Sequence, residues 1–183
     1  MCKNRCHWVS DDPIYIHYHD NEWGKPVYDD VKLYELFLLE TFQAGLSWIT
    51  ILHKREYFKE AFDNFDVYKI SHYNASKINE LMSNKNIIRN KRKILAAIKN
   101  AKIFIEIQKE YGSFSKYIWK FTNNKIIYLK DNPLVTTSEL SDEISNDLKK
   151  RGMSFVGSIT IYSYLEAIGI LNNHQKQCYL YVK

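Results

Sequence analysis

The amino-acid sequence predicts a mostly α-helical protein with two helical lobes, one of which is made of both chain ends. Apolar residues recur at spacings of three and four through most of the chain, as they do on the buried face of a helix. Only residues 123–138 form a long stretch with little periodicity. We expect a single unit over residues 1–183, with one lobe at roughly 66–122 and the other formed by 1–65 plus 139–183.

The composition indicates an ordinary globular protein in a reducing compartment. Of 183 residues, 45% are hydrophobic and 26% are charged, and no apolar run approaches the roughly 20 residues that a membrane helix needs. The first residues lack the apolar core of a signal peptide. Three cysteines, an odd number, are in such a compartment more often metal ligands than halves of disulfides. We therefore expect a cytoplasmic protein without membrane association.

The first clear helix is expected over residues 29–41. One stripe of this helix carries Leu33, Leu36, Phe37 and Glu40. A second amphipathic helix follows over residues 46–62, after a break at Gly45, and residues 75–83 form a short third helix. The pattern thus changes only at short breaks, as in a bundle of packed helices.

The longest helix is expected to open near Asn90 and to end at Gly112. Its apolar repeat, at spacings of four, three and four, consists of Ile94, Ile98, Ala101 and Ile105. Residues 113–121 form another short helix. A further helix is expected over residues 141–152. Its signals are Ser141 as the N-cap, acidic residues in the first turn and basic residues in the last turn.

The last helix is expected over residues 158–169. This segment has enough β-branched residues to suggest a strand. Its length and the terminating Gly169 favour a buried helix instead.

Glu40 is a carboxylate on an otherwise apolar helix face. An unpaired buried carboxylate costs several kcal/mol, so it needs either an arginine or helix-end amides, or a pocket that takes a cationic ligand. Five aromatic residues gather within the first fifty positions: Trp8, Tyr15, Tyr18, Trp23 and Trp48. Such a set is either ordinary core or a cage for a flat cation.

Two basic clusters, at residues 85–93 and 149–151, stand out against a modest net charge of +5. The first includes much of the sequence NKNIIR, a tight turn between a helix ending near Ser83 and a helix opening near Asn90. Outward-facing amides and bases in such a turn would make a phosphate clamp, as in a helix-hairpin-helix. A plain corner between two helices is the alternative.

His174 and Cys178 lie four positions apart near the end of the chain and read as half of a metal site. Spacing alone does not decide which residues complete it. Near the other end the chain offers Cys2, Cys6, His7, His17 and His19.

Five stretches, in order over essentially the whole chain, resemble one family, DNA-3-methyladenine glycosylase I. They are residues 6–24, 43–52, 86–94, 149–157 and 172–178. The resemblance implies a helix-hairpin-helix fold and removal of 3-methyladenine from alkylated double-stranded DNA. It also implies base flipping, a monofunctional reaction and one structural zinc that joins the N- and C-terminal segments.

The resemblance also implies roles for individual residues. The zinc ligands would be Cys6, His19, His174 and Cys178, a closed tetrahedral set without a position for water. Glu40 would recognise the base as the catalytic carboxylate, Trp48 would stack on it and Tyr18 would line the pocket. The neighbouring pocket residues would be Trp8, Tyr15 and Trp23. The DNA contacts of the turn would come from Asn86, Ile87, Arg89, Asn90 and Lys91.

Two departures from the family pattern bear on these roles. Asn86 stands where the family's turn usually has glycine, and because Asn tolerates positive φ we expect the turn to survive with weaker phosphate contact. No supporting aspartate stands in the place that the wider superfamily uses, and neither Asp142 nor Asp147 is assigned that role. We expect a monomer.

Three other functions are weighed against the glycosylase. A non-enzymatic, zinc-stabilised DNA-binding module explains the basic turn but not a carboxylate among tryptophans. A zinc hydrolase needs an open coordination position, which a set of two cysteines and two histidines lacks. A lyase would need a lysine nucleophile in the pocket, and no lysine near the turn is distinguishable from a phosphate contact.

Overall fold

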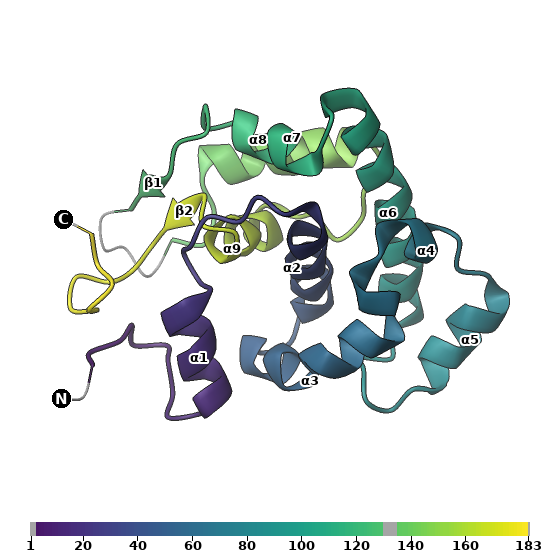
Figure 1. The fold of residues 1–183 in the computed structure, drawn as a ribbon, viewed down its shortest axis with the longest axis horizontal. Coiled ribbons are helices and arrows are strands. Elements are labelled where there is room, and N and C mark those ends of the chain that lie inside the picture. Colours follow the sequence, from purple (N-terminus) through teal and green to yellow (C-terminus); the bar gives the residue numbers. More distant parts are fainter. Residues whose placement is uncertain (1–2, 130–134, 183) are drawn as a thin grey trace.

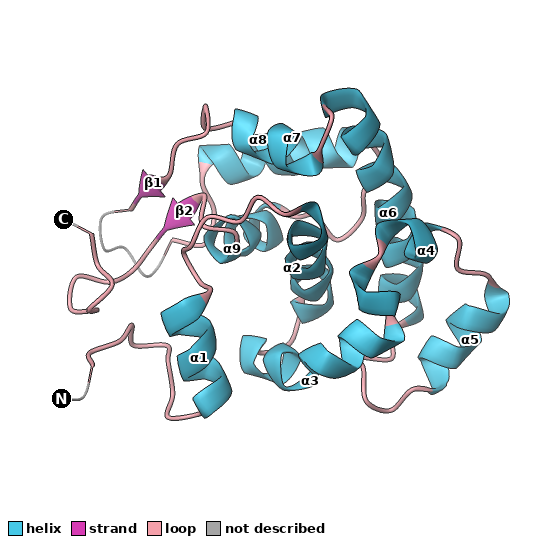
Figure 2. Ribbon diagram, in the orientation of Figure 1, coloured by secondary structure: helices cyan, strands magenta, loops and turns pink. Residues whose placement is uncertain are grey.

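The computed structural model describes residues 3–129 and 135–182, and these residues form nine α-helices, one short 3-10 helix and two short strands (Figures 1 and 2). The first helices are α1 (Pro13–Asn21), α2 (Asp30–Gln43), α3 (Trp48–Ala61), α4 (Val67–Ser71) and α5 (Ala75–Ser83). The others are α6 (Lys91–Tyr111), α7 (Phe114–Lys120), α8 (Glu139–Lys150) and α9 (Ser158–Ala167). The 3-10 helix η1 (Asp63–Phe65) lies between α3 and α4, and the strands are β1 (Ile127–Tyr128) and β2 (Leu171–Asn172). The mostly helical prediction is confirmed.

Helix α2 lies at the centre of the molecule and packs against α3, α6, α7 and α9 (Figure 1). Its central position explains its sequence, because nine of its fourteen residues are buried, Glu40 among them. The longest helix, α6, packs against α4, α5 and α7, and α8 packs on α9. One hydrophobic core therefore extends from α2 to the buried faces of α3, α6, α7, α8 and α9.

Most helix ends follow the local signals in the sequence. Asn90 caps α6 by accepting a hydrogen bond from the Lys93 amide, and Gly112 ends that helix at a φ of 84°. Gly169 follows α9 at a φ of 73°. The segment at residues 158–169, whose β-branched residues suggested a strand, is helical over Ser158–Ala167, and five residues of this helix are buried.

The expected N-cap of α8 was wrong by one turn. Ser138 caps the helix, and Ser141 occupies the third helical position, where its hydroxyl accepts from the Ser138 amide in a reciprocal capping box. Both serines are typical of N-caps, so the local pattern fits either start. The structure selects Ser138 because the Ser141 hydroxyl is buried and also hydrogen-bonds Ser158 (2.8 Å).

Five of the described elements were not expected from periodicity: α1, η1, α4, β1 and β2. Helix α1 is short and starts at Pro13 after the Asp12 cap, and α4 spans little more than one turn. Strand β1 lies within the expected connector of residues 123–138 and pairs in parallel with β2, Ile127 opposite Leu171. Pro133, which belongs to the same connector, lies outside the described residues.

The two chain ends lie on the same side of the molecule, next to α1 and β2 (Figure 1). The Tyr179 amide donates to the Asn4 carbonyl (2.9 Å), which ties the segment after β2 to the segment before α1. None of the described helices combines the length and apolar content that a bilayer crossing requires.

Candidate functional site

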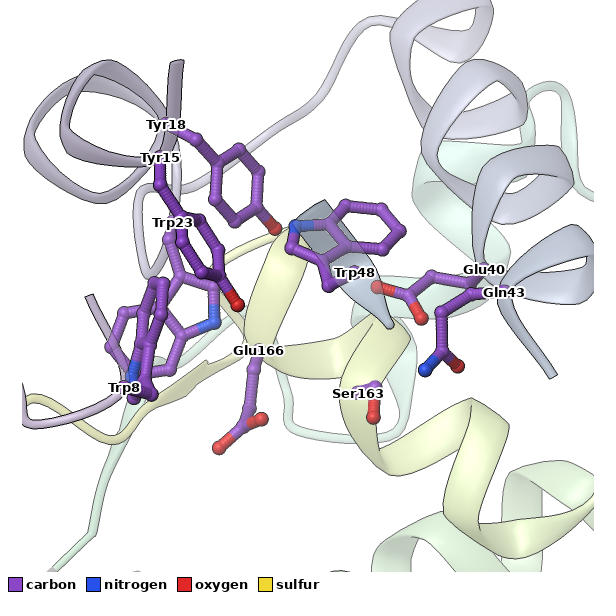
Figure 3. A pocket seen from close by; sticks show the side chains of 9 residues that line it. All are labelled: Trp8, Tyr15, Tyr18, Trp23, Glu40, Gln43, Trp48, Ser163 and Glu166. Atoms are coloured by element: carbon purple, nitrogen blue, oxygen red, sulfur yellow. The ribbon is translucent and has the colours of Figure 1, made fainter. Parts of the chain in front are cut away.

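A cavity of about 200 Å³ brings together residues of α1, α2, α3 and α9 (Figure 3). Its lining consists of Trp8, Tyr15, Tyr18, Trp23, Glu40, Gln43, Trp48, Ser163 and Glu166. The five aromatic residues that the sequence analysis grouped together therefore line one pocket with Glu40. Periodicity placed Glu40 on a buried face, and the tertiary structure puts that face beside the aromatic residues.

Glu40 is 4% exposed and forms no hydrogen bond or ion pair with any described residue. Its carboxylate extends from α2 toward Trp48 (Figure 3). Burial, and to a lesser degree the charge of Glu166, raises the pKa of Glu40 to about 8. Neither an arginine nor a helix-end amide satisfies this carboxyl group, so it is left available to a ligand.

The aromatic side chains form two contacting groups around the cavity. Trp8 packs against Tyr15 and Trp23, with ring centroids 5.0 and 4.9 Å apart, and Tyr18 packs against Trp48 at 5.4 Å. The Trp48 indole N–H is buried and has no acceptor among the described residues. An acceptor on Glu40 and a donor on Trp48 thus both lack partners in the same region, which is typical of a binding pocket.

Sequence reasoning missed Gln43, Ser163 and Glu166. Burial raises the pKa of Glu166 to about 7, against the effect of a hydrogen bond from the Asn173 side-chain amide (2.8 Å). Glu166 is the one acidic residue in the apolar segment 158–169, so the reasoning applied to Glu40 could have found it. Gln43 and Ser163 carry no such signal, because polar residues at helix edges are common.

Four buried residues from the two chain ends form a second cluster: Cys6, His19, His174 and Cys178. Each offers one ligand atom, and these atoms all lie within 4.8 Å of one another. This is the set that the family resemblance selected from the alternatives. His7 is exposed and bonded to Gln175, and His17 is exposed and bonded to Asn21. Cys2 lies outside the described residues.

The spacing of these donors fits one tetrahedral ion. The Cys6 and Cys178 sulfurs each lie 3.7 Å from His174 Nδ1, and the Cys178 sulfur lies 3.5 Å from His19 Nε2. Metal–sulfur bonds of about 2.3 Å and metal–nitrogen bonds of about 2.0 Å place neighbouring donors of a tetrahedron roughly 3.3–3.8 Å apart. These residues can therefore hold a metal ion without rearrangement.

The surroundings of the cluster orient its donors. His19 donates from Nδ1 to Asp20 (2.8 Å), and Arg5 binds the Asp20 carboxylate through two hydrogen bonds of 2.8 and 2.7 Å. Fixing the proton on Nδ1 leaves His19 Nε2 free to coordinate. Backbone amides donate to both sulfurs, at 3.4 Å for Cys6 and 3.5 Å for Cys178.

The turn between α5 and α6 lies beside the C-terminal end of α2. Arg89 and Lys91 are exposed, and the amides of Ile87 and Arg89 have no acceptor among the described residues. The Lys93 amine reaches from α6 to the carbonyls of Phe42 (2.8 Å) and Ala44 (2.7 Å). The turn is therefore fixed close to the helix that carries Glu40.

The other residues expected to contact DNA have structural roles in this turn. Ile87 is 3% exposed and packs in the core, so only its backbone is open to a ligand. The side-chain oxygen of Asn90 accepts a hydrogen bond from the Lys93 amide and so caps α6. Asn86 is exposed and accepts from Lys54 through its carbonyl (3.0 Å), and its φ is not positive. The tolerance of asparagine for positive φ is therefore not needed here, and Asn86 occupies the turn without backbone strain.

A family model described as methyladenine glycosylase matches residues 8–181 of the chain. The protein belongs to this family. A DNA-3-methyladenine glycosylase of Haemophilus influenzae is 44% identical over 178 residues, which cover 95% of this chain and 96% of that protein. Relatedness over nearly the full length of both chains confirms the resemblance seen in the sequence.

Solved structures of methyladenine glycosylases have the same fold. A crystal structure of a 3-methyladenine DNA glycosylase I matches at a TM-score of 0.94 and 40% identity, covering 98% of this chain and 100% of that one. A second structure shows the basis of 3-methyladenine recognition by the Staphylococcus aureus enzyme. It matches at a TM-score of 0.93 and 38% identity, covering 100% of this chain and 99% of that one.

The raised pKa of Glu40 predicts how stability depends on pH. Between the ordinary value of 4.5 and the folded value of about 8, the folded protein keeps a proton that the unfolded chain has lost. The free energy of unfolding therefore falls as pH rises through this window. Glu40→Gln removes the effect, so its melting temperature should exceed that of the wild type by on the order of 5–10 °C at pH 8 and by little near pH 4.5.

Thermal melts of both proteins at intervals from pH 4.5 to 8.5 measure this difference. Glu143→Gln, at an exposed position on α8, is the matched control and should follow the wild type throughout. A difference between Glu40→Gln and wild type that stayed constant with pH would show that Glu40 is not a buried acid.

Proposed function

We propose that this protein is a monofunctional DNA glycosylase that hydrolyses the N-glycosidic bond of 3-methyladenine in alkylated double-stranded DNA. The observation that carries the proposal is the partnerless Glu40 carboxylate, buried at the edge of an aromatic pocket. Membership of the methyladenine glycosylase family, and a homologous structure that shows 3-methyladenine recognition, support it.

The chemistry of the damaged base matches the pocket. Methylation at N3 gives the adenine of a nucleotide a positive charge, which makes it a much better leaving group than the normal base. A carboxylate and aromatic faces stabilise such a cation, whereas a neutral adenine gains little from them. Glu40 supplies the carboxylate, Trp48 the stacking face and Tyr18 a further wall of the cavity.

The reaction requires the nucleotide to leave the helix. A base inside a duplex cannot reach a carboxylate that is 4% exposed, so the target must be flipped into the pocket. Trp8, Tyr15 and Trp23 complete the wall that would exclude water from the base. Ionised Glu40 favours the cationic base and the positive charge that develops on the sugar as the N-glycosidic bond breaks, before water attacks the sugar carbon and loses a proton.

A simple hydrolysis fits the pocket better than a lyase reaction. No lysine lines the cavity in the described part of the chain. The Lys93 amine, which lies near the turn, donates to two backbone carbonyls and is not free to attack a sugar. The rival of a purely DNA-binding module gives no reason for a buried carboxylate without a partner.

We propose that the cluster of two cysteines and two histidines holds one structural zinc. Four protein donors close a tetrahedral site, so the ion would join the chain ends without activating water. We also propose that residues 1–183 act as one monomeric unit, in which 66–122 form a helix-hairpin-helix lobe and both chain ends form the other.

The zinc proposal predicts one tightly bound ion per chain, detected by elemental analysis of protein purified without chelator. Cys178→Ser should lose the ion and lower the melting temperature by on the order of 10 °C or more, because metal binding contributes to folding. Cys2→Ser, the matched control, should keep both. Wild-type protein without bound zinc, or a zinc loss caused by Cys2→Ser, would contradict the proposed ligand set.

The proposed role of Glu40 is tested with methylated DNA. Chromatography of the released bases should find 3-methyladenine for the wild type. Glu40→Gln should lower kcat/KM roughly ten- to a hundredfold, because one charge-assisted contact contributes about 1.5–3 kcal/mol. It should weaken calorimetric binding of free 3-methyladenine as well. Glu143→Gln should behave as the wild type. A well-folded Glu40→Gln protein with unchanged activity and base affinity would show that the pocket is wrongly assigned.

The α5–α6 turn should bind phosphates without reading sequence or damage. Arg89→Ala and Lys91→Ala should weaken binding to damaged and undamaged duplexes alike, and each should flatten the log–log salt dependence of affinity by about one unit. Lys116→Ala, at an exposed position on α7, serves as the control and should bind as the wild type. A variant that lost affinity for damaged DNA alone would refute this role.

A further inference from the structure

A hollow of about 690 Å³ shares one wall residue, Tyr18, with the base pocket. The hollow is also lined by a network of ion pairs among four charged residues: Glu22, Lys32, Glu35 and Arg55. None of these four residues lines the base pocket itself, and the roles proposed so far use none of them.

Arg55, on α3, is the centre of this network. Its Nε donates to Glu35 on α2 (2.6 Å), and its two terminal nitrogens donate to the two carboxylate oxygens of Glu22 (2.8 and 2.7 Å). Glu22 is the C-cap of α1. The Lys32 amine lies 3.1 Å from an oxygen of each carboxylate. One guanidinium therefore joins α1, α2 and α3, and we call Arg55, Glu22 and Glu35 the Arg55 clamp.

The same three helices each supply a residue of the base pocket. Tyr18 comes from α1, Glu40 from α2 and Trp48 from α3 (Figure 3). Helix α1 packs mainly on α3, and α3 in turn packs on α2. The position of Tyr18 relative to Glu40 therefore depends on links that span all three helices, and the Arg55 clamp is such a link.

The clamp lies next to the contact between Tyr18 and Trp48 along the same helix faces. On α3, residues at spacings of four and three share one face, and they are Trp48, Leu52 and Arg55. On the other side of the interface, Glu22 follows Tyr18 by four positions. The Tyr18 and Trp48 ring centroids lie 5.4 Å apart, and Leu52 is buried in the same cluster. Arg55 lies about 10 Å along α3 from Trp48, at 1.5 Å of rise per residue.

The clamp is ionised and mostly removed from solvent. The side chains of Arg55, Glu22 and Glu35 are 13%, 21% and 15% exposed. Burial acts to raise the pKa of Glu22, but the hydrogen bonds and charges of Arg55 and Lys32 outweigh it and lower the pKa to about 2. Forked bonds between a guanidinium and a carboxylate fix direction as well as distance. The clamp therefore sets how α1 and α3 lie against each other.

We propose that Arg55 is a positioning residue for the glycosylase reaction, which holds Tyr18 and Trp48 in the orientation in which they face Glu40. The inference rests on the proposed function, since it takes the substrate of the pocket from there. Arg55 does not touch the base. It acts through Glu22, which fixes the end of α1 one turn beyond Tyr18, and through Glu35, which fixes α2 ahead of Glu40. Positioning matters because a displacement of about 1 Å at a reacting centre can cost roughly a hundredfold in rate.

Arg55→Met tests the role, because it removes the fork and keeps much of the side-chain length. It should lower kcat for 3-methyladenine release and the affinity for free 3-methyladenine, each roughly ten- to a hundredfold. Arg55→Lys, which keeps the charge but not the fork, should fall between Arg55→Met and wild type. Affinity for an undamaged duplex should not change, because the clamp lies outside the α5–α6 turn. Lys59→Met, at an exposed position on the same helix, is the matched control and should behave as the wild type.

A variant without unpaired charges separates positioning from a purely stabilising role. Arg55→Met leaves two carboxylates with only Lys32 as a partner, so its melting temperature should fall. Adding Glu22→Gln and Glu35→Gln removes these charges, and the triple variant should recover much of the melting temperature. Its kcat and base affinity should stay low. Wild-type kcat and base affinity in the folded triple variant, or in folded Arg55→Met, would overturn the inference, because the clamp would then only stabilise the fold.

A measurement on the pocket wall separates this inference from the proposed function. Nuclear Overhauser effects between the Tyr18 and Trp48 rings, which are in contact, should be present in the wild type and in Lys59→Met and weakened in the triple variant. A wild type that released no 3-methyladenine, while the triple variant still lost these effects, would refute the glycosylase and leave the positioning role standing. Unchanged effects in a triple variant with reduced base affinity would overturn the inference, because the loss would then not arise from the orientation of these rings.

Discussion

The junction of the two chain ends determines where the aromatic wall of the pocket stands. Cys6 and His174, 168 positions apart in sequence, bring their ligand atoms within 3.7 Å of each other. Trp8 packs on His19 with ring centroids 5.3 Å apart, and Trp23 packs on His174 at 4.8 Å. The tryptophans therefore pack directly on histidines of the cluster of two cysteines and two histidines. A change that separated the chain ends would displace the tryptophans from one side of the pocket, and it would affect the central helix α2 only afterwards.

Charge separates the parts of the molecule that maintain the fold from those open to a ligand. Arg55 and Arg151 are held by carboxylates, and their ion pairs link elements of the structure. Arg89 and Lys149 are exposed and form no ion pair with described residues. The acidic counterpart is Glu40, whose burial raises its pKa. The exposed cations suit the negatively charged backbone of DNA. The buried carboxyl group of Glu40 suits a damaged base that carries a positive charge.

Much of the fold could be predicted from short-range patterns. Helices α2, α3, α5, α6, α7, α8 and α9 each carry an apolar repeat that one or two turns suffice to reveal. Helix α1 is as long as α5, but its sequence PIYIHYHDN lacks a clear apolar repeat; α4 has only five residues, and β1 and β2 have two each. Strand pairing between Ile127 and Leu171 depends on where the rest of the chain brings them. The N-cap of α8 was misplaced because two serines three positions apart both fit a helix start.

The sequence by itself determined that a carboxylate at position 40 would be buried, since its neighbours at three and four positions are apolar. It also determined that His174 and Cys178 share a helix-like spacing, but their partners came only from the family resemblance. The tertiary structure decided that Glu166 joins Glu40 in one pocket and that Arg55 joins Glu22 to Glu35. Local patterns extend over a few residues along one element. Packing decides which faces of distant helices meet, and packing depends on side chains from the whole chain together.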